Sequence, residues 1–151
     1  MPGVNPRSTT FRDSPEEQWL QAVKRDLGDD FAQRILRFER MEPEDFRVFN
    51  ERLKKFVQEH REVNTSRMRK VYEVIRNATT ISELLLGLPK LAYMVGKEER
   101  RGAKEHLGVL YMVFSQSIAQ AREEKDLQGI RKFAEALVAY HKFYAENRNQ
   151  G

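Results

Sequence analysis

The sequence of 151 residues contains no cysteine. This absence excludes disulfide bonds, thiolate catalysis and cysteine metal sites, so the fold must be stabilised by packing alone. Long apolar runs are also missing, since no window approaches the roughly 18 apolar residues that cross a bilayer. No apolar stretch follows the first charged residues, as it would in a secretory signal. We therefore expect a cytoplasmic protein.

Strand-like alternation of apolar and polar residues is not sustained anywhere in the chain. Apolar residues recur instead at spacings of three and four, which is typical of amphipathic helices. The length suits one core rather than two. We predict an all-α protein, a compact helical bundle of six to seven helices at residues 14–147, with a flexible, disordered arm at 1–13 and a short tail at 148–151.

Several residues mark the expected ends of helices. Ser14 precedes Pro15, which is the order of an N-cap serine and a proline at the first helical position. Gly28 is expected to end this helix, and Asp29–Asp30 to cap the next one. Asp126 is expected to cap the last helix.

Pro89 interrupts an apolar stripe that otherwise continues at helical spacing. The stripe before it contains Leu84, Leu85 and Leu88. Because proline has no N–H to donate to the carbonyl of Leu85, we predict a kink or a break at this point.

Residues that could carry catalysis are present but do not form a recognisable centre. Carboxylate pairs such as Glu98-Glu99 fall at expected helix ends or on polar faces, where solvated charge is the simpler interpretation. The glycines never form a phosphate-binding loop after a strand. We predict no catalytic residue and no cofactor.

The three histidines lie on three different expected helices. None of them, His60, His106 or His141, belongs to a His-x-x-x-His or His-Glu-x-x-His pair. We predict no metal site. His141 lies beside Leu137 and Tyr144 on an apolar face, so we interpret it as a hydrogen-bonded core histidine.

The formal net charge is +4 and the isoelectric point about 9.4, a balance that favours acidic partners such as nucleic acid. Solubility is the alternative explanation. On a helical wheel, the apolar stripe within residues 68–75 is bordered by Arg67 on one side and by Arg69 and Arg76 on the other, and Lys70 lies at the back. This rim could bind phosphates, although Glu73 could also pair with both arginines.

A second basic cluster follows Pro89. It consists of Lys90, Lys97, Arg100, Arg101 and Lys104, and Tyr93 lies among these side chains. A tyrosine between basic residues can stack on a base or sugar, although half-buried packing is also common for a tyrosine on a helix flank.

Three apolar residues lie opposite the core stripe of the helix expected from residue 103. Val109, Met112 and Val113 predict a second contact surface, for the N-terminal helices of the same chain or for another subunit. A fully buried central helix would explain them as well.

Three segments carry a resemblance to a known family. They are RKVYEVIR at residues 69–76, LPKLAY at 88–93 and ALVAYHKFY at 136–144. In this combination they resemble the small subunit of the type III-A CRISPR Csm effector complex. The likeness covers residues 65–144, a family-like core, and leaves the N-terminal helices at 14–61 without a matching motif.

The resemblance implies a helical, non-catalytic protein of antiviral defence, stacked in several copies in a ribonucleoprotein. Its partners would be guide RNA and target RNA, the backbone and large subunits of the Csm complex, and neighbouring copies of itself. On matching positions it implies that RNA is contacted by Arg69, Lys70, Arg76, Lys90, Tyr93, His141 and Lys142. Because such a subunit must accept any target sequence, we expect it to bind phosphates and duplex shape rather than base edges.

Two other functions compete with this one. A DNA-binding regulator of the helix-turn-helix type would need a helix that presents base-reading side chains, and residues 67–77 with Glu73 fit that poorly. A structural adaptor would act through apolar faces such as Val109, Met112 and Val113, with its charges serving solubility.

Overall fold

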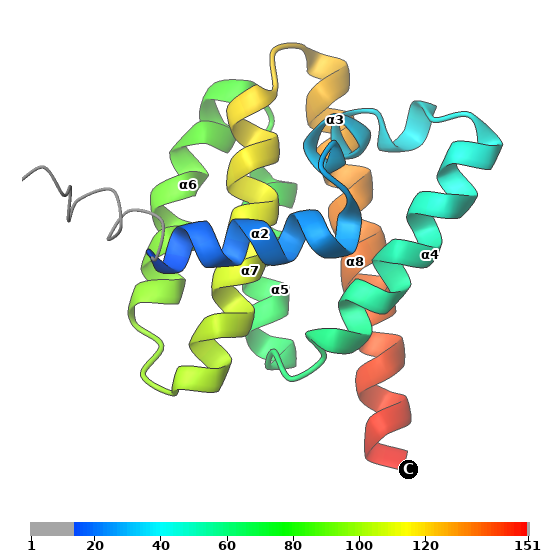
Figure 1. Ribbon diagram of the computed structural model, residues 1–151. Coiled ribbons are helices and arrows are strands. Elements are labelled where there is room, and N and C mark those ends of the chain that lie inside the picture. The colour runs from blue at the N-terminus through cyan, green and yellow to red at the C-terminus, as the bar shows by residue number, and fades with distance from the viewer. Residues whose placement is uncertain (1–13, 151) are drawn as a thin grey trace, which may run out of the picture.

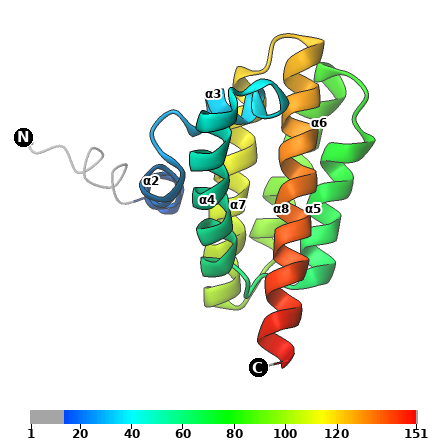
Figure 2. The ribbon, with the colours of Figure 1, turned by 90° about the vertical axis from the view of Figure 1, so that its right-hand side faces the viewer.

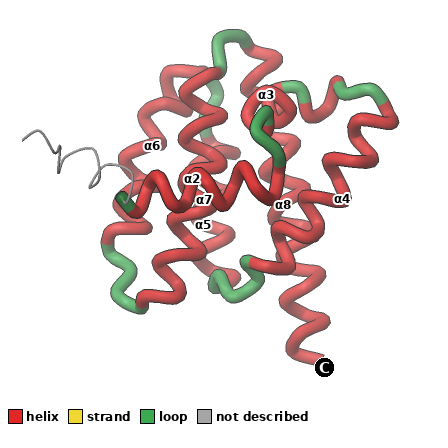
Figure 3. The backbone as a smooth tube through the Cα atoms, viewed as in Figure 1, coloured by secondary structure: helices red, strands yellow, loops and turns green. Residues whose placement is uncertain are grey.

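The computed structural model describes residues 14–150, and the arm expected at 1–13 lies outside them. Within this range Figure 3 shows helices joined by short loops and no strand. The elements are α2 (Pro15–Leu27), α3 (Phe31–Leu36), the 3-10 helix η1 (Phe38–Arg40), α4 (Pro43–Glu59), α5 (Thr65–Asn77), α6 (Ile81–Gly96), α7 (Arg101–Gln120) and α8 (Glu124–Gln150). The predicted all-α fold is confirmed.

Most of the long helices run along one axis, and α2 crosses them. Figure 2 shows α4, α5, α7 and α8 upright while α2 is seen almost end-on. Figure 1 shows α2 lying across α7, and α2 also contacts α4. On the other side of the bundle, α5 lies between α6 and α8 and packs against both. The α5–α6 pair therefore forms an outer wall of the bundle.

Aromatic side chains from four elements form part of the core. Phe38, Phe49, Phe114 and Phe133 are all buried. The ring of Phe133 lies 5.6 Å from that of Phe38 and 5.9 Å from that of Phe114, both in edge-on geometry. Because edge-on pairs are stabilising beyond the apolar area they bury, this cluster fixes η1 and α4 against α7 and α8.

The helix α2 begins and ends as the sequence predicts. The Ser14 hydroxyl accepts the N–H of Glu17, and Gly28 ends α2 with φ of 100°. The predicted cap of α3 is wrong in its chemistry, because the Asp30 side chain makes no capping hydrogen bond and binds Arg34 instead. A carboxylate at the start of a helix can pair with a cation four residues later instead of capping the backbone, as Asp30 does with Arg34.

Asp126 lies inside the first turn of α8 rather than ahead of it. Its carboxylate reaches back to accept the backbone N–H groups of Arg122 and Glu123. It therefore stabilises the α7–α8 turn, and the helix itself begins three residues earlier than an Asp126 cap predicts.

Pro89 does not break the helix that contains it. α6 runs unbroken from Ile81 to Gly96 with the proline inside it. Both Pro89 and Leu85 are on the exposed face, so water can reach the carbonyl that lacks a donor. The apolar stripe also differs from the prediction, because Leu84 is buried whereas Leu85 is 43% exposed.

Two glycines allow close approaches between helices. A Cβ built on Gly108 of α7 would lie 2.2 Å from Cε2 of the Trp19 indole. On α8, a Cβ at Gly129 would lie 2.1 Å from the carbonyl oxygen of Leu36. These distances are too short for any side chain, so glycine is what lets α2 and α3 lie against α7 and α8.

Among the described helices, none combines the length and the apolar character that crossing a membrane requires.

Candidate nucleic-acid interface

A groove of about 790 Å³ lies between α5 and α6. Two lysines predicted to contact RNA, Lys70 from α5 and Lys90 from α6, both line it, and so does Tyr93. The rest of the lining is mixed: Glu73, Val74, Asn77, Ala78, Glu83, Leu86, Gly87, Pro89 and Met94. Residues 20 positions apart in the sequence are thus brought to one surface.

Tyr93 is the aromatic residue in the lining of this groove. It is 68% exposed, and the Nζ atom of Lys97 lies 5.4 Å from the centroid of its ring. A cation at this distance from a tyrosine face is attracted by the ring quadrupole, which holds the ring and the ammonium group together. The half-buried packing considered from the sequence does not apply to this side chain.

Two glutamates reduce the positive charge of the groove. Glu83 is held at the start of α6, where it accepts the N–H and the hydroxyl of Thr79, each at 2.7 Å. The Thr79 N–H bond is the main cause that lowers the pKa of the Glu83 carboxyl below its ordinary value. Glu83 is therefore a charged residue with its Oε1 atom engaged by Thr79 of the same chain.

Arg69 and Arg76 are exposed and lie seven residues apart, on the same face of α5. From the sequence, Glu73 could have neutralised both of them. Among the described residues, none of the ion pairs includes Glu73. The structure brings these arginines to the α5 surface beside the groove but not into its lining.

The loop between α6 and α7 is organised by a buried carboxylate. Glu98 is 4% exposed, and its oxygens lie 2.8 Å from Arg67 Nη1 and 3.7 Å from Arg100 Nε. The expectation of a solvated Glu98-Glu99 pair is wrong for Glu98, because the loop folds it against Arg67 of α5 and its near neighbour Arg100.

Arg100 also donates its backbone N–H to Glu98 at 3.0 Å. This bond is the main cause that lowers the pKa of the Glu98 carboxyl, and the charges of Arg67 and Arg100 add to it while burial opposes it. The Arg100 side chain remains 74% exposed and Arg101 is exposed as the first residue of α7, so both basic groups stay accessible.

His141 and Lys142 are adjacent in sequence but lie in different environments. His141 is 1% exposed, and its Nε2 atom lies 2.8 Å from the carbonyl oxygen of Val63. This geometry matches the core interpretation, and it leaves no surface through which RNA could reach the ring. Lys142 is exposed on α8.

The three apolar residues of α7 lie inside the chain. Val109, Met112 and Val113 are 5%, 5% and 0% exposed and belong to the core. Both α2 and α3 pack against α7, so the second contact surface faces the N-terminal helices, one of the two alternatives. These side chains are not accessible to another subunit in this structure.

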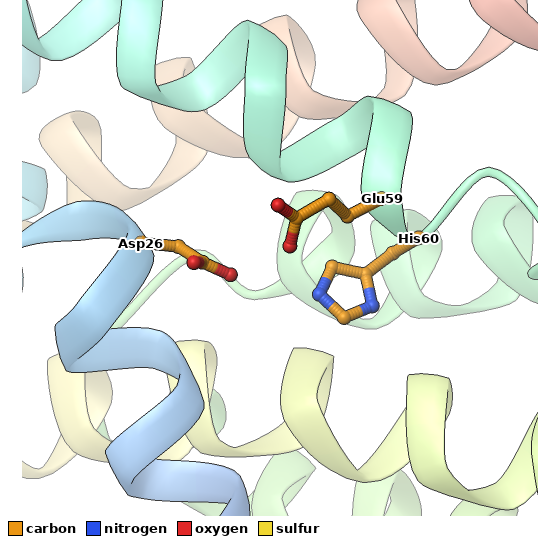
Figure 4. Close-up of side chains that lie close together, drawn as sticks. All are labelled: Asp26, Glu59 and His60. Carbon is orange, nitrogen blue, oxygen red and sulfur yellow. The ribbon is translucent and has the colours of Figure 1, made fainter.

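Sequence spacing did not reveal a polar cluster at the α2–α4 contact. His60 and His106, 46 residues apart, approach to 2.8 Å between their Nδ1 atoms. Asp26 and Glu59 lie beside His60, and Figure 4 shows the two carboxylates and the imidazole directed toward one another. Only the fold brings Asp26 and His106 to the adjacent Glu59 and His60, since these residues come from three separate segments of the chain.

A family model described as Csm2 Type III-A matches residues 25–147. The match extends beyond the motifs at 65–144 and includes α3, η1 and α4, which no motif had linked to the family. No curated protein matches the chain, and no solved structure does.

Proposed function

The chain belongs to the Csm2 family, the small subunits of the type III-A Csm complex, and we propose that it contacts the paired guide and target RNA through the α5–α6 groove. The observation that carries the proposal is Tyr93, an exposed ring set among three lysines. Lys70 and Lys90 share the groove with it, and Lys97 lies at its face.

This surface suits an RNA backbone better than a sequence. Lysines on rigid helices supply charge to phosphates, and an exposed aromatic ring stacks on any base or on ribose without selecting one. Lys70 and Lys90 approach from two packed helices, so their separation is fixed by the fold. A subunit that must accept every target requires this kind of contact.

Arg69 and Arg76 extend the proposed surface along α5, and Arg100, Arg101 and Lys142 are further exposed cations that we assign to it. His141 is omitted because it is buried. The glutamates of the groove keep the affinity of one copy modest. In the proposal, several neighbouring copies act together along the RNA, and the chain itself is non-catalytic.

The test uses the assembled Csm complex reconstituted with Lys70→Glu and Lys90→Glu in this subunit. The matched control carries Lys55→Glu and Lys125→Glu, which make the same charge change at exposed positions of α4 and α8. Target RNA affinity is measured over a series of salt concentrations. We expect the slope of log K against log salt to fall by about 0.7 to 0.9 for each lost phosphate contact in the groove variant.

Equal affinity and equal salt slopes in the two variants would exclude the groove as an RNA contact. The adaptor function makes a different prediction, because charges that serve only solubility can be reversed without loss of either incorporation or RNA affinity. Co-purification with the other subunits measures incorporation, and the affinity of the assembled complex for target RNA then separates the two functions.

A further inference from the structure

Three side chains from two helices converge where α2 meets the end of α4. Asp26 lies in the last turn of α2, Glu59 is the last residue of α4, and His60 caps α4. One ligand atom from each lies within 4.8 Å of the other two. Figure 4 shows a ring nitrogen of His60 facing the two carboxylates.

Two of the converging atoms are buried and have no hydrogen-bond partner. His60 is 8% exposed and its Nε2 atom has no hydrogen-bond partner. The Oδ2 atom of Asp26 is also buried and also has no hydrogen-bond partner. The other oxygen of Asp26 pairs with Arg25 at 3.2 Å. Buried polar atoms without partners are costly, so a cation that accepts a lone pair from each of these two neighbouring atoms would be stabilised here.

His106 orients the His60 ring from the opposite side. The Nδ1 atoms of the two rings are 2.8 Å apart, so one Nδ1–H donates a hydrogen bond and the other Nδ1 accepts it. When His60 donates, its Nε2 carries a free lone pair directed at the carboxylates. A histidine ligand that donates its second N–H to a neighbour is the common arrangement at protein metal sites.

The protonation states agree with this geometry. Burial, followed by the neighbouring His106, lowers the pKa of His60 to about 4, so the imidazole is neutral near pH 7. Burial and the charge of Asp26 raise the pKa of the Glu59 carboxyl. A divalent cation between the two carboxylates would remove their mutual repulsion.

We propose that Asp26, Glu59 and His60 bind a divalent transition-metal ion of the Zn²⁺ type. Imidazole nitrogen with carboxylate oxygen is a donor set that Zn²⁺ accepts, whereas Mg²⁺ and Ca²⁺ prefer oxygen alone. Tetrahedral bonds of about 2.0 to 2.1 Å place ligand atoms about 3.3 Å apart, so the three groups must close in on the ion. Glu59 is exposed and can make this movement, with water as the fourth ligand.

The alternative occupant is a proton shared by Asp26 and Glu59. It would satisfy the carboxylates but would leave the Nε2 atom of His60 unpartnered. Bound zinc would also connect α2 to α4, since its ligands belong to both helices.

The experiment titrates Zn²⁺ into the purified full-length chain after chelator treatment, using calorimetry and thermal unfolding. We expect binding of one ion per chain. At a free Zn²⁺ concentration of about 100 times the dissociation constant, the melting temperature should rise by about 5 to 10 °C. Mg²⁺ at the same concentration should do neither.

Glu59→Gln removes a ligand from an exposed position and so preserves the fold, and His60→Gln removes the nitrogen ligand. Both should weaken Zn²⁺ binding at least tenfold, whereas Glu62→Gln, which changes a carboxylate outside the cluster, should not. Zn²⁺ binding that survives Glu59→Gln and His60→Gln, or no binding by the unmodified chain, overturns the proposal.

Discussion

The indole of Trp19 lies directly against Gly108, where a Cβ atom would be 2.2 Å from Cε2 of the ring. The indole N–H also donates to Oε2 of Glu105 at 2.8 Å, one turn earlier on α7. The contact with Gly108 therefore sets how closely α2 approaches α7, and the hydrogen bond to Glu105 sets where along α7 it crosses.

Gly108→Ala should destabilise the protein by about 1 to 2 kcal/mol. Overpacking costs about 1 to 3 kcal/mol, and the better helix propensity of alanine returns up to about 1 kcal/mol. Urea unfolding followed by circular dichroism measures the change. Gly102→Ala is the matched control, since no atom lies within 4 Å of its Cβ, and it should be neutral or stabilising. Equal effects of the two substitutions would contradict the role of the Trp19 contact.

Glu98→Gln should reduce the dependence of stability on pH. The pKa of Glu98 in the folded protein lies below its ordinary value of 4.5, so the carboxylate stabilises the fold above that value. The contribution is lost as pH falls from about 4.5 through the lower folded pKa. Unfolding curves between pH 7 and pH 3 should therefore decline less steeply for Glu98→Gln than for the unmodified chain, and Glu99→Gln, at an exposed position, should follow the unmodified chain.

Tyr93→Ala should weaken target RNA binding by the assembled complex about tenfold, because stacking on an aromatic ring contributes about 1 to 3 kcal/mol per base. Tyr93→Phe keeps the ring and should keep the affinity. The side chain is 68% exposed, so neither substitution should change the free energy of unfolding by more than about 0.5 kcal/mol. An RNA affinity unchanged by Tyr93→Ala would argue against stacking.

His141→Leu should destabilise the fold by about 1 to 3 kcal/mol, because the carbonyl of Val63 loses its donor in a buried site. Ala139→Ser, at an exposed position of the same helix, should stay within about 0.5 kcal/mol. Filter-binding with the folded fraction should show the same RNA affinity for both. A selective loss of RNA binding in His141→Leu would instead restore a direct contact at this residue.

Local sequence signals predicted the helices because their causes are local. Ser14 and Gly28 act on backbone groups within a few residues, so the start and the end of α2 could be read directly. The continuation of α6 through Pro89 could not, because it depends on which face of the helix meets solvent. The same reason explains why Leu84 rather than Leu85 is buried.

The polar clusters were missed for a different reason. Glu98 is buried by Arg67, and His60 approaches His106, from positions 31 and 46 residues away. Neither pair forms a spacing motif, since a helix surface relates only residues three or four positions apart. For the groove, by contrast, charge and aromatic content predicted the residue types, and the packing of α5 on α6 supplied their common location.

The crossing of α2 over α7 also has a consequence for synthesis of the chain. Trp19 and its partner Glu105 are 86 residues apart, so α2 leaves the ribosome long before the helix that receives it. At about 5 to 20 residues per second this delay is roughly 4 to 17 s. During that time the face that carries Trp19, Val23 and Leu27 lacks its main packing partner. α2 therefore docks on α7 long after its own synthesis, and in that interval this part of its apolar face is open to chaperones.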